Sequence, residues 1–453
     1  MNIALIFPRY KYQSGDAPLG ILYIATYLRK NGYDVDVYDT TFHKNKSELL
    51  GMLASKNYDF VGFSLMTTML RDSLQIAAYI KSCNPKTKIV FGGPHPTVMA
   101  EETLKHKDVD AVVIGEGEEA WLEVAKKASF DGVGGVWYKD CSAIIRNSPR
   151  DTFLELDHLP FPDQRLVDLN RYLRNWWQLD SVGKKLRGVN IINSRGCPYN
   201  CSFCQPTLRK IFGPRIRFRS PANVVEELKF WKKEIGIDAF MFQDDTLIFN
   251  KEWVREFCCM LKKARLQLVW GCNARANLVE YELFFLMRSA GLRKVFMGIE
   301  SGSQRVLDEV YQKGISLGQV RQSVSILKKL GLKIQGYFMM GAPTETVEDV
   351  SDTIRLASEL SIDEATFSIT TPLPHTYLYE KTRHMICTDV GNFDYYKNPV
   401  LSGAEVIPRR VLRRLKQQAL LRFYLSPKRL KGTLAGFANP ASMHKSLIKL
   451  QRF

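Results

Sequence analysis

Short apolar stretches alternate with helical segments along most of this chain, and this rhythm constrains the fold more than any other feature. In the N-terminal part, residues 19–30 and 70–82 have the periodicity of helices and separate stretches that read as strands. The expected strands are residues 2–7, 35–38, 60–64, 89–91 and 111–114. Strands that alternate with helices form a doubly wound parallel sheet. The sequence therefore predicts an α/β domain of Rossmann-like architecture over residues 1–135.

The same rhythm resumes after a less regular segment, residues 136–185, which is predicted to connect two domains. Six further strands are expected at residues 189–193, 239–243, 268–273, 294–298, 334–340 and 365–370. Helices are expected at residues 221–235, 251–265, 281–290, 317–330 and 346–360. Six βα units are fewer than the eight of a complete barrel. Residues 186–385 are therefore predicted to form a partial (β/α)6 barrel.

Lysine and arginine residues concentrate at the C-terminal end. Residues 406–453 contain twelve Lys or Arg and no Asp or Glu, which leaves +5 of the net charge of +17 for the rest of the chain. A helix that begins after Pro408 would carry its apolar residues on one face, namely Leu412, Leu415, Ala419 and Phe423. Such a helix either lies on anionic lipid or packs on the barrel with its basic face in water. Residues 386–453 are thus predicted to be a basic helical region.

Composition excludes several classes of protein. With 45% hydrophobic and 25% charged residues the chain is typical of folded globular proteins and not of disordered ones. No stretch approaches the roughly 18 apolar residues that span a bilayer, and the apolar start is too short for a signal peptide. Nine cysteines in such a chain indicate thiol or metal chemistry rather than disulfides. We expect a cytoplasmic protein, with the basic tail as a potential contact to the inner face of the membrane.

Three of the nine cysteines lie in one loop just after the first expected barrel strand. Cys197, Cys201 and Cys204 are spaced so that three thiolates can surround one face of an iron–sulfur cube. Four cysteines are usual where such a cube only transfers electrons, so three leave one iron open to a substrate. A zinc site is the alternative, but no second Cys-x2-Cys pair is present to complete it. The spacing favours a [4Fe–4S] cluster held by these three cysteines.

This cysteine motif, with the aromatic Phe203 before its last cysteine, resembles that of the radical S-adenosylmethionine (SAM) superfamily. Three N-terminal stretches are similar to the cobalamin-binding domain of its B12-dependent branch, and three barrel stretches follow in the family's order. These stretches are residues 17–23, 91–97, 113–118, 243–246, 298–303 and 341–346. The resemblance extends over residues 2–430. It is close to the anaerobic magnesium-protoporphyrin ester cyclase group and to lipid-modifying relatives.

The resemblance implies that SAM binds the open iron and is cleaved by an electron from the cluster to a 5′-deoxyadenosyl radical. Several positions match SAM-binding positions of the family: Phe203 and Gly341 near the adenine, Gln243, Asp244 and Asp245 at the methionine amino group, and Glu300 and Ser301 at the ribose or methionine. A carboxylate suits an ammonium group, because a charge-assisted hydrogen bond is strong in a dry site.

Cobalamin is expected at the other domain, since ligands of doubly wound sheets bind beyond the carboxyl ends of the strands. The residues expected there are Ser64, Gly92, Gly93, His95, Gly115, Glu116 and Gly117. The loop after the second strand departs from the Asp-x-His-x-x-Gly motif of other cobalamin domains, so His43 is expected at the surface. The sequence therefore assigns no residue as the lower ligand of the cobalt.

The resemblance implies radical C-methylation or ring formation on a hydrophobic substrate such as a lipid or tetrapyrrole, with an electron donor such as flavodoxin or ferredoxin. Two other hypotheses remain. One is a methylthiotransferase-like enzyme that modifies tRNA, which the positive charge would suit. The N-terminal region has only Cys83 and Cys141 where such enzymes carry three further cysteines, so nucleic acid is not the favoured partner. The other is a cobalamin sensor or carrier without catalytic activity, which the cysteine triplet disfavours.

Overall fold

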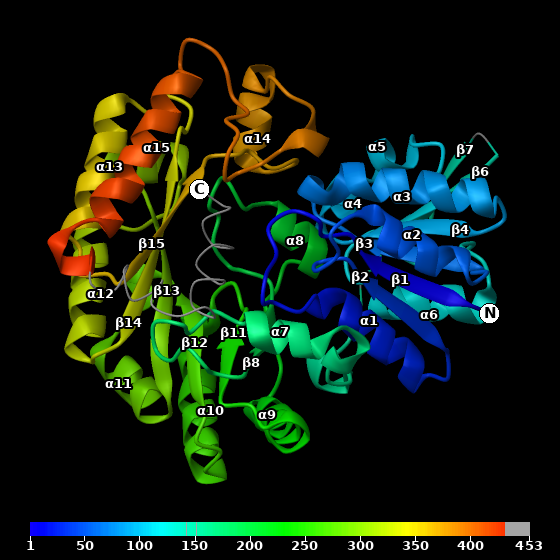
Figure 1. The fold of residues 1–453 in the computed structure, drawn as a ribbon, viewed down its shortest axis with the longest axis horizontal. Coiled ribbons are helices and arrows are strands. Elements are labelled where there is room, and N and C mark those ends of the chain that lie inside the picture. The colour runs from blue at the N-terminus through cyan, green and yellow to red at the C-terminus, as the bar shows by residue number, and fades with distance from the viewer. Residues whose placement is uncertain (142, 151, 431–453) are drawn as a thin grey trace. The chain divides into compact units, whose positions relative to one another are not determined.

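The chain divides into two compact units in the computed structural model, which describes residues 1–141, 143–150 and 152–430 (Figure 1). Unit 1 consists of Met1–Tyr172, Pro206–Arg217 and Asp389–Phe393. Unit 2 consists of Leu173–Gln205, Phe218–Thr388 and the described part of Asp394–Phe453.

Unit 1 is built on one sheet with the strand order β2-β1-β3-β4-β5-β6-β7. All five predicted strands are present and pair in parallel: β1 (Ile3–Phe7), β2 (Val35–Asp39), β3 (Phe60–Ser64), β4 (Lys88–Gly92) and β5 (Ala111–Val113). The helices between and after them are α1 (Leu19–Lys30), α2 (Lys46–Ala54), α3 (Leu70–Cys83), α4 (Pro94–Val98), α5 (Ala100–Leu104) and α6 (Glu118–Lys127). Residues of α1 and α6 share one apolar core, and residues of α2 and α3 share another. Helices on both faces confirm the doubly wound sheet.

Two antiparallel strands extend this sheet beyond the predicted five. β6 (Val136–Asp140) pairs with β5, and β7 (Ala143–Arg146) pairs with β6. The expectation that an irregular segment begins at residue 136 was wrong for these residues. The strands are short, and charged side chains interrupt them, so their apolar alternation is weak in the sequence. Their position is set by hydrogen bonding to β5, which the local sequence does not report.

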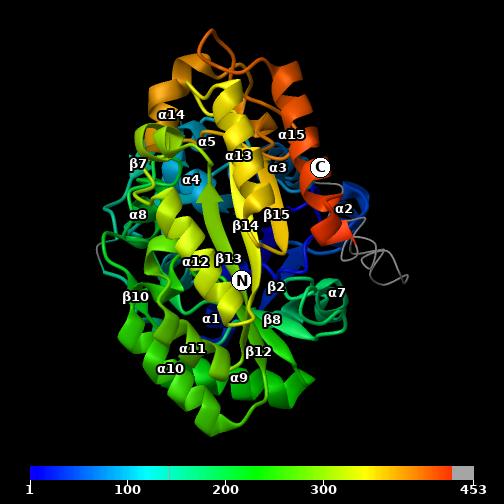
Figure 2. The ribbon, with the colours of Figure 1, turned by 90° about the vertical axis from the view of Figure 1, so that its left-hand side faces the viewer.

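Unit 2 contains a six-stranded parallel sheet with the order β15-β14-β13-β12-β11-β8. Its strands are β8 (Gly188–Ile191), β11 (Ala239–Phe242), β12 (Val269–Ala274), β13 (Leu292–Glu300), β14 (Lys333–Met340) and β15 (Glu364–Ile369). Its long helices are α9 (Pro221–Ile235), α10 (Lys251–Ala264), α11 (Tyr281–Ser289), α12 (Leu317–Lys329) and α13 (Val347–Glu359), which cover one face of the sheet in Figures 1 and 2. Each predicted strand and helix is present within a few residues, which confirms the partial (β/α)6 barrel.

Side chains that precede the helices explain where most of these helices begin. A hydroxyl or amide oxygen of the residue before the helix accepts a hydrogen bond from a backbone N–H of the first turn, which would otherwise lack a partner. The capping residues are Ser220, Asn250, Ser316 and Thr346.

The strands of unit 2 present alternate side chains to the helices and to the inner face of the barrel. Phe240 and Phe242 of β11 belong to the core under the helices. Met241, between them, packs with Trp176 and Leu179 in a small cluster on the inner face. Successive residues at the end of β11 therefore point to opposite faces of the sheet.

The basic C-terminal region forms α15 (Arg409–Tyr424), which begins after Pro408 as predicted. The apolar residues of its inner face are buried in the core of unit 2: Leu412, Leu415, Ala419 and Phe423. They pack where α15 meets α13 and β15. Of the two arrangements open from the sequence, the structure has the helix packed on the barrel, so this apolar face does not face lipid. Residues 431–453 of the predicted tail lie outside the described residues.

Short elements complete the described chain. They are α7 (Leu169–Asn175), α8 (Thr207–Phe212), α14 (Tyr377–Thr382), β9 (Ser194–Arg195), β10 (Arg217–Phe218), η1 (Thr67–Met69), η2 (Leu156–His158), η3 (Gln164–Leu166), η4 (Leu247–Phe249), η5 (Ala276–Leu278), η6 (Val306–Val310), η7 (Arg383–Met385) and η8 (Val390–Asn392). None of the helices formed by the described residues is long and apolar enough to cross a membrane.

Candidate functional site

The three cysteines of the motif lie in the loop that follows β8 and β9, beyond the carboxyl end of the first barrel strand. Cys201 is buried, and Cys197 and Cys204 are half-buried. The loop turns tightly, because the backbone N–H groups of Cys204 and Gln205 both donate to the carbonyl of Cys201 at 3.0 Å. Desolvation raises the pKa of the Cys197 and Cys204 thiols, and the neighbouring Cys201 raises both further. The Cys201 thiol therefore lies near both of the other thiols.

The donor set of this loop fits an iron–sulfur cluster better than a single metal ion. Among the described residues, no three His, Cys, Asp or Glu side chains are arranged to hold one metal ion. Three soft thiolates from one loop are the ligand type that iron–sulfur clusters take, with each thiolate on a different iron. Ligation by Cys197, Cys201 and Cys204 stays a prediction.

Asp244 holds the start of this loop in place. Its carboxylate accepts hydrogen bonds from the backbone N–H groups of Asn193 at 3.1 Å and Ser194 at 2.5 Å, and from the Ser194 hydroxyl at 2.5 Å. The side chain is 1% exposed, and burial raises its pKa to about 6. Both carboxylate oxygens are thus engaged by the loop, so Asp244 shapes the cysteine loop, and its contact with SAM stays a prediction.

The residues on either side of Asp244 are better placed for a ligand. The strand alternation puts Gln243 and Asp245 on the same side as the inner-face residue Met241. Asp245 is exposed. The protein around it and the charge of Asp244 raise its pKa to about 7. The Nε2 atom of Gln243 is buried without a hydrogen-bond partner. Because buried polar atoms are almost always hydrogen-bonded, this orphaned donor indicates a site that a polar ligand completes.

A buried ion pair brings three parts of the site together. Glu300, the last residue of β13, accepts a hydrogen bond from Lys313 at 2.6 Å, and Lys313 is 7% exposed. The Lys313 ammonium group also lies 5.7 Å from the centre of the Phe203 ring and lowers the pKa of Cys204. A side chain on Gly298 would place its Cβ 2.4 Å from the Glu300 carboxylate, so only glycine leaves room for the pair. Lys313 was not predicted from the sequence.

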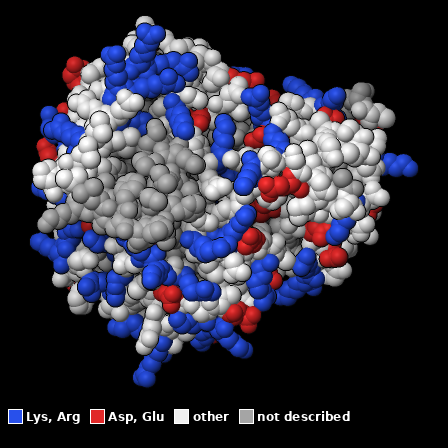
Figure 3. Space-filling model, viewed as in Figure 1, with Lys and Arg blue, Asp and Glu red and all other residues white. Residues whose placement is uncertain are grey.

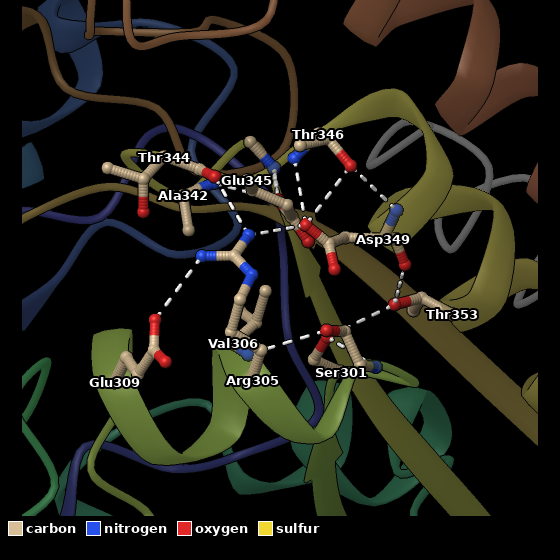
Figure 4. Close-up of polar contacts among 12 residues, drawn as sticks. Ser301, Arg305, Val306, Glu309, Ala342, Thr344, Glu345, Thr346, Asp349 and Thr353 are labelled. Carbon is tan, nitrogen blue, oxygen red and sulfur yellow. Dashed lines mark hydrogen bonds and ion pairs between the residues drawn. The ribbon is translucent and has the colours of Figure 1, made fainter.

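Two other predicted SAM residues, Ser301 and Gly341, have structural roles in this fold, and Figure 4 shows Ser301 beside Thr353. The Ser301 side chain is fully buried, lies 3.2 Å from the Thr353 hydroxyl, and accepts from the backbone of Ser303. Gly341 has a positive φ of 82°, and a Cβ there would lie 2.4 Å from the Leu412 side chain of α15. The Ser301 hydroxyl is explained by its contacts with Thr353 and Ser303, and the missing side chain of Gly341 by its contact with Leu412. Contact of Ser301 or Gly341 with SAM stays a prediction.

Glu345 is a buried carboxylate that the sequence analysis did not single out. One oxygen accepts the backbone N–H groups of Gly341 at 2.5 Å and Ala342 at 2.9 Å. The other oxygen is buried without a partner, and burial raises the pKa of Glu345 to about 7. Figure 4 shows it beside Arg305, which donates to the Thr344 carbonyl at 2.8 Å. Glu345 thus fixes the turn after β14, and its type and position gave no separate signal in the sequence.

The first group of predicted cobalamin residues lies where β3 and β4 end. Ser64 and Gly92 are the last residues of these strands, and Gly93 has a positive φ of 95° in the turn to α4. His95 is 2% exposed, and its Nδ1 lies 3.1 Å from the Thr67 hydroxyl. Burial lowers the pKa of His95 to about 4, so its ring is neutral at physiological pH.

The second group lies at the end of β5, where other parts of unit 1 already contact it. Glu116 forms an ion pair with Arg217. A Cβ on Gly115 would lie 3.3 Å from the carbonyl of Ile211 in α8, and one on Gly117 would lie 2.7 Å from the Ile24 side chain. The structure thus accounts for these glycines by packing, and the Glu116 carboxylate has a protein partner. Contact of either group with cobalamin stays a prediction.

His43, which is expected at the surface, is partly exposed. It is half-buried, and its Nδ1 is buried without a hydrogen-bond partner.

Known proteins resemble the chain over nearly all of its length. Residues 15–125 match the family described as B12 binding domain, and residues 191–357 match the Radical SAM superfamily. Over 91% of its length the chain is 33% identical to an uncharacterized methyltransferase, PH0819, of Pyrococcus horikoshii, and covers 88% of that protein. Over 87% of its length it is 28% identical to the anaerobic magnesium-protoporphyrin IX monomethyl ester cyclase of Rubrivivax gelatinosus, and covers 72% of it.

A solved structure has the same fold. The radical SAM methyltransferase TsrM from Kitasatospora setae, with cobalamin and a [4Fe–4S] cluster bound, matches with a TM-score of 0.70 and 19% identity. The match covers 84% of this chain and 74% of that one.

Proposed function

Because this chain belongs to the cobalamin-binding radical SAM methyltransferase family that includes PH0819, we propose that it methylates an unactivated carbon of a hydrophobic substrate, such as a tetrapyrrole or a lipid. Its B12 binding and radical SAM domains follow each other in the predicted order, and they confirm cobalamin, SAM and a [4Fe–4S] cluster as the cofactors. The finer assignments, namely the ligating residues and the substrate, are proposals.

The observation that carries this proposal is the three-thiol loop at the carboxyl ends of the barrel strands. Cys197, Cys201 and Cys204 would hold the cluster, and the residue that tightens the loop around them is Asp244. When bound, the cluster and SAM supply one-electron chemistry, and cobalamin supplies a transferable methyl group. The protein's part is to keep the loop fixed and the site dry.

The inner-face residues next to this loop suit the groups of SAM. The Asp245 carboxylate suits the ammonium group of SAM, and the unpartnered Nε2–H of Gln243 suits an acceptor such as the SAM carboxylate. Lys313, which already pairs with Glu300, offers a buried ammonium group to a carboxylate. Phe203 offers an aromatic face for a base. These contacts follow from the chemistry of each side chain.

Similarity to the magnesium-protoporphyrin ester cyclase supports a flat apolar substrate. Methylation and ring formation differ in whether a methyl group reaches the product, and the name of PH0819 favours methylation. The cluster needs a one-electron reductant, so we propose a flavodoxin or ferredoxin as the electron donor.

The test is anaerobic reconstitution of the protein with iron, sulfide and cobalamin, followed by incubation with SAM that carries a deuterated methyl group. We expect 5′-deoxyadenosine and S-adenosylhomocysteine from the wild type, and neither above background when Cys197, Cys201 and Cys204 are all replaced by Ala. Cys259→Ala removes an exposed cysteine of α10 and is the matched control, which should retain both products. Equal 5′-deoxyadenosine from wild type and triple variant contradicts the proposal.

Substrate class is tested with the same protein. Porphyrin and isoprenoid-lipid candidates are incubated with the reconstituted enzyme, and products are analysed by mass spectrometry. Transfer of the deuterated methyl group to either class supports methylation, and a product that lacks the label but has lost hydrogen indicates ring formation.

A further inference from the structure

Arg275 lies directly against the cysteine loop, although neither composition nor motif draws attention to it. It follows β12 and precedes η5, at the carboxyl end of the third barrel strand. Its Nη1 donates to the Sγ of Cys201 at 3.4 Å. Its guanidinium group lies 3.9 Å from the centre of the Tyr199 ring, which is in the same loop. One arginine therefore contacts both a predicted cluster ligand and the loop's aromatic residue.

Two contacts keep this guanidinium group in place. It stacks on the Tyr199 ring, and its Nη1 donates to the Sγ of Cys201. Stacking on an aromatic face is favourable for arginine, whose planar group is weakly hydrated. The arrangement orients the N–H groups of Arg275 toward Cys201.

The charge of Arg275 lacks a protein counter-charge. The residue is only 9% exposed, and within the described residues no Asp or Glu carboxylate lies within 4.0 Å of it. Its Nε is also buried without a hydrogen-bond partner. A buried charge without a partner is costly, usually by several kcal/mol, and arginine does not escape this cost by losing its proton. Arg275 donates to the Sγ of Cys201, which would be a thiolate as a cluster ligand.

We propose that Arg275 is a positioning residue whose fixed charge balances the [4Fe–4S] cluster and raises its reduction potential. The inference rests on the proposed function, because it requires a cluster ligated by Cys201. A cube held by three thiolates gains a further negative charge when it takes up an electron. A guanidinium group beside one of its sulfurs stabilises the reduced form more than the oxidised form. Hydrogen bonds to the sulfurs and local charge are known to set cluster potentials.

The test compares Arg275→Gln and Arg275→Lys with the wild type. Each protein is reconstituted anaerobically, its iron and sulfide are quantified, and the cluster is titrated with dithionite while its reduced signal is followed by electron paramagnetic resonance. For Arg275→Gln we expect at least a tenfold shift of the redox equilibrium toward the oxidised cluster, about 59 mV more negative for a one-electron couple. Arg275→Lys keeps the charge and should recover part of the shift.

Arg321→Gln is the matched control. Arg321 is an exposed arginine of α12 that pairs with Glu359, so its loss changes the net charge equally without touching the cysteine loop. Its potential should equal that of the wild type. The proposal is overturned if Arg275→Gln and the wild type have the same potential at equal cluster content.

Failure to assemble a cluster is also informative. If Arg275→Gln loses the cluster while Arg275→Lys holds it, the need for a positive charge is supported. If both variants lose it while circular dichroism stays that of the wild type, charge is not what Arg275 provides and the proposal is overturned. If the wild type holds no cluster, the proposed function itself fails, which is distinct from a wild-type cluster with unchanged potential.

Discussion

Asp244 and Asp245 are adjacent carboxylates with different surroundings. Asp244 is buried and accepts three hydrogen bonds from Asn193 and Ser194, whereas Asp245 is exposed. Asp244→Ala would leave two buried backbone N–H groups without acceptors, at about 1–3 kcal/mol each. We expect Asp244→Ala to lower the free energy of unfolding by about 2–4 kcal/mol, measured by denaturant unfolding. Asp245→Ala, the matched control, removes no such acceptor and should not lower the free energy of unfolding, and equal losses in both would refute the role of Asp244 in holding the cysteine loop.

Glu345 links stability to pH. Its pKa is raised from 4.5 to about 7 because it is buried. Between these values the folded protein keeps a proton that the unfolded chain has released, so this group makes the free energy of unfolding fall as pH rises from about 4.5 to 7. The full loss is about 3 kcal/mol. Asp244 and Asp245 also have raised pKa values, so they too make the free energy of unfolding fall as pH rises. The difference between wild type and Glu345→Gln therefore isolates the contribution of Glu345.

In Glu345→Gln the stability measured by urea unfolding should decline less between pH 4.5 and 7 than in the wild type. Parallel curves for the two proteins would show that the side chain titrates as it does in water.

At the scale of elements, α15 packs closely against the turn after β14 because Gly341 in that turn has no side chain. A Cβ on Gly341 would lie 2.4 Å from Leu412 of α15, and the residue has a positive φ of 82°. Gly341→Ala should therefore cost at least about 2 kcal/mol, from overpacking and from the left-handed backbone. The measurement is a double-mutant cycle with Leu412→Ala, in which removal of the clash should make Gly341→Ala less costly. If Gly341→Ala costs as much stability with Leu412→Ala as without it, the contact with Leu412 is not the source of the cost.

The outward face of α15 carries exposed basic side chains, and we propose that this face contacts anionic lipid. Figure 3 shows Lys and Arg side chains gathered where Figure 1 draws the start of α15. Arg410 and Arg414 are exposed. Reversal of both charges to Glu should weaken binding to phosphatidylserine vesicles at least tenfold, since each basic residue near such a surface contributes about 1 kcal/mol.

Neutral vesicles and high salt are the controls for this prediction, and both should abolish binding by the wild type. Equal binding of variant and wild type to anionic vesicles would show that Arg410 and Arg414 do not contact anionic lipid. Truncation after Gly403 is not a clean test, because it also removes core residues such as Leu412 and Phe423.

Elements with a strong local pattern could be predicted, and those defined by distant partners could not. The barrel strands are apolar and the helices between them have N-caps, so both were found from the sequence to within a few residues. β6 and β7 have a weak pattern and are set by pairing with β5. In the site, the cysteine spacing and the carboxylates after β11 are local features. Arg275 is not, because 74 positions separate it from Cys201.

Several predicted ligand residues also have a partner within the fold. Asp244, Ser301 and Glu116 are polar residues at strand ends, as a ligand site requires. Each contacts another protein side chain, namely Ser194, Thr353 and Arg217 respectively, and their contacts with a ligand stay predictions. A sequence pattern reports that a polar group lies near a strand end, but it does not report which neighbour satisfies it.

At the scale of the whole molecule, cobalamin binding by unit 1 can be tested separately from the cluster of unit 2. Cobalamin that binds folded unit 1 and not the unfolded chain should stabilise it, by about 2.7 kcal/mol at a hundred times the dissociation constant. A thermal unfolding scan with hydroxocobalamin should show a raised transition. The Cys197, Cys201 and Cys204 triple variant should show the same rise, because its changes lie in unit 2. No rise in either protein would argue against cobalamin binding.

Unit 1 is assembled from three separate stretches, Met1–Tyr172, Pro206–Arg217 and Asp389–Phe393, so the chain passes between the two units five times. On the ribosome, the B12-binding unit reaches its final composition only when residue 393 has emerged, long after its own sheet has been made. Its last piece, Asp389–Phe393, is synthesised after all six barrel strands. Unit 1 is therefore complete only when almost all of unit 2 has been synthesised.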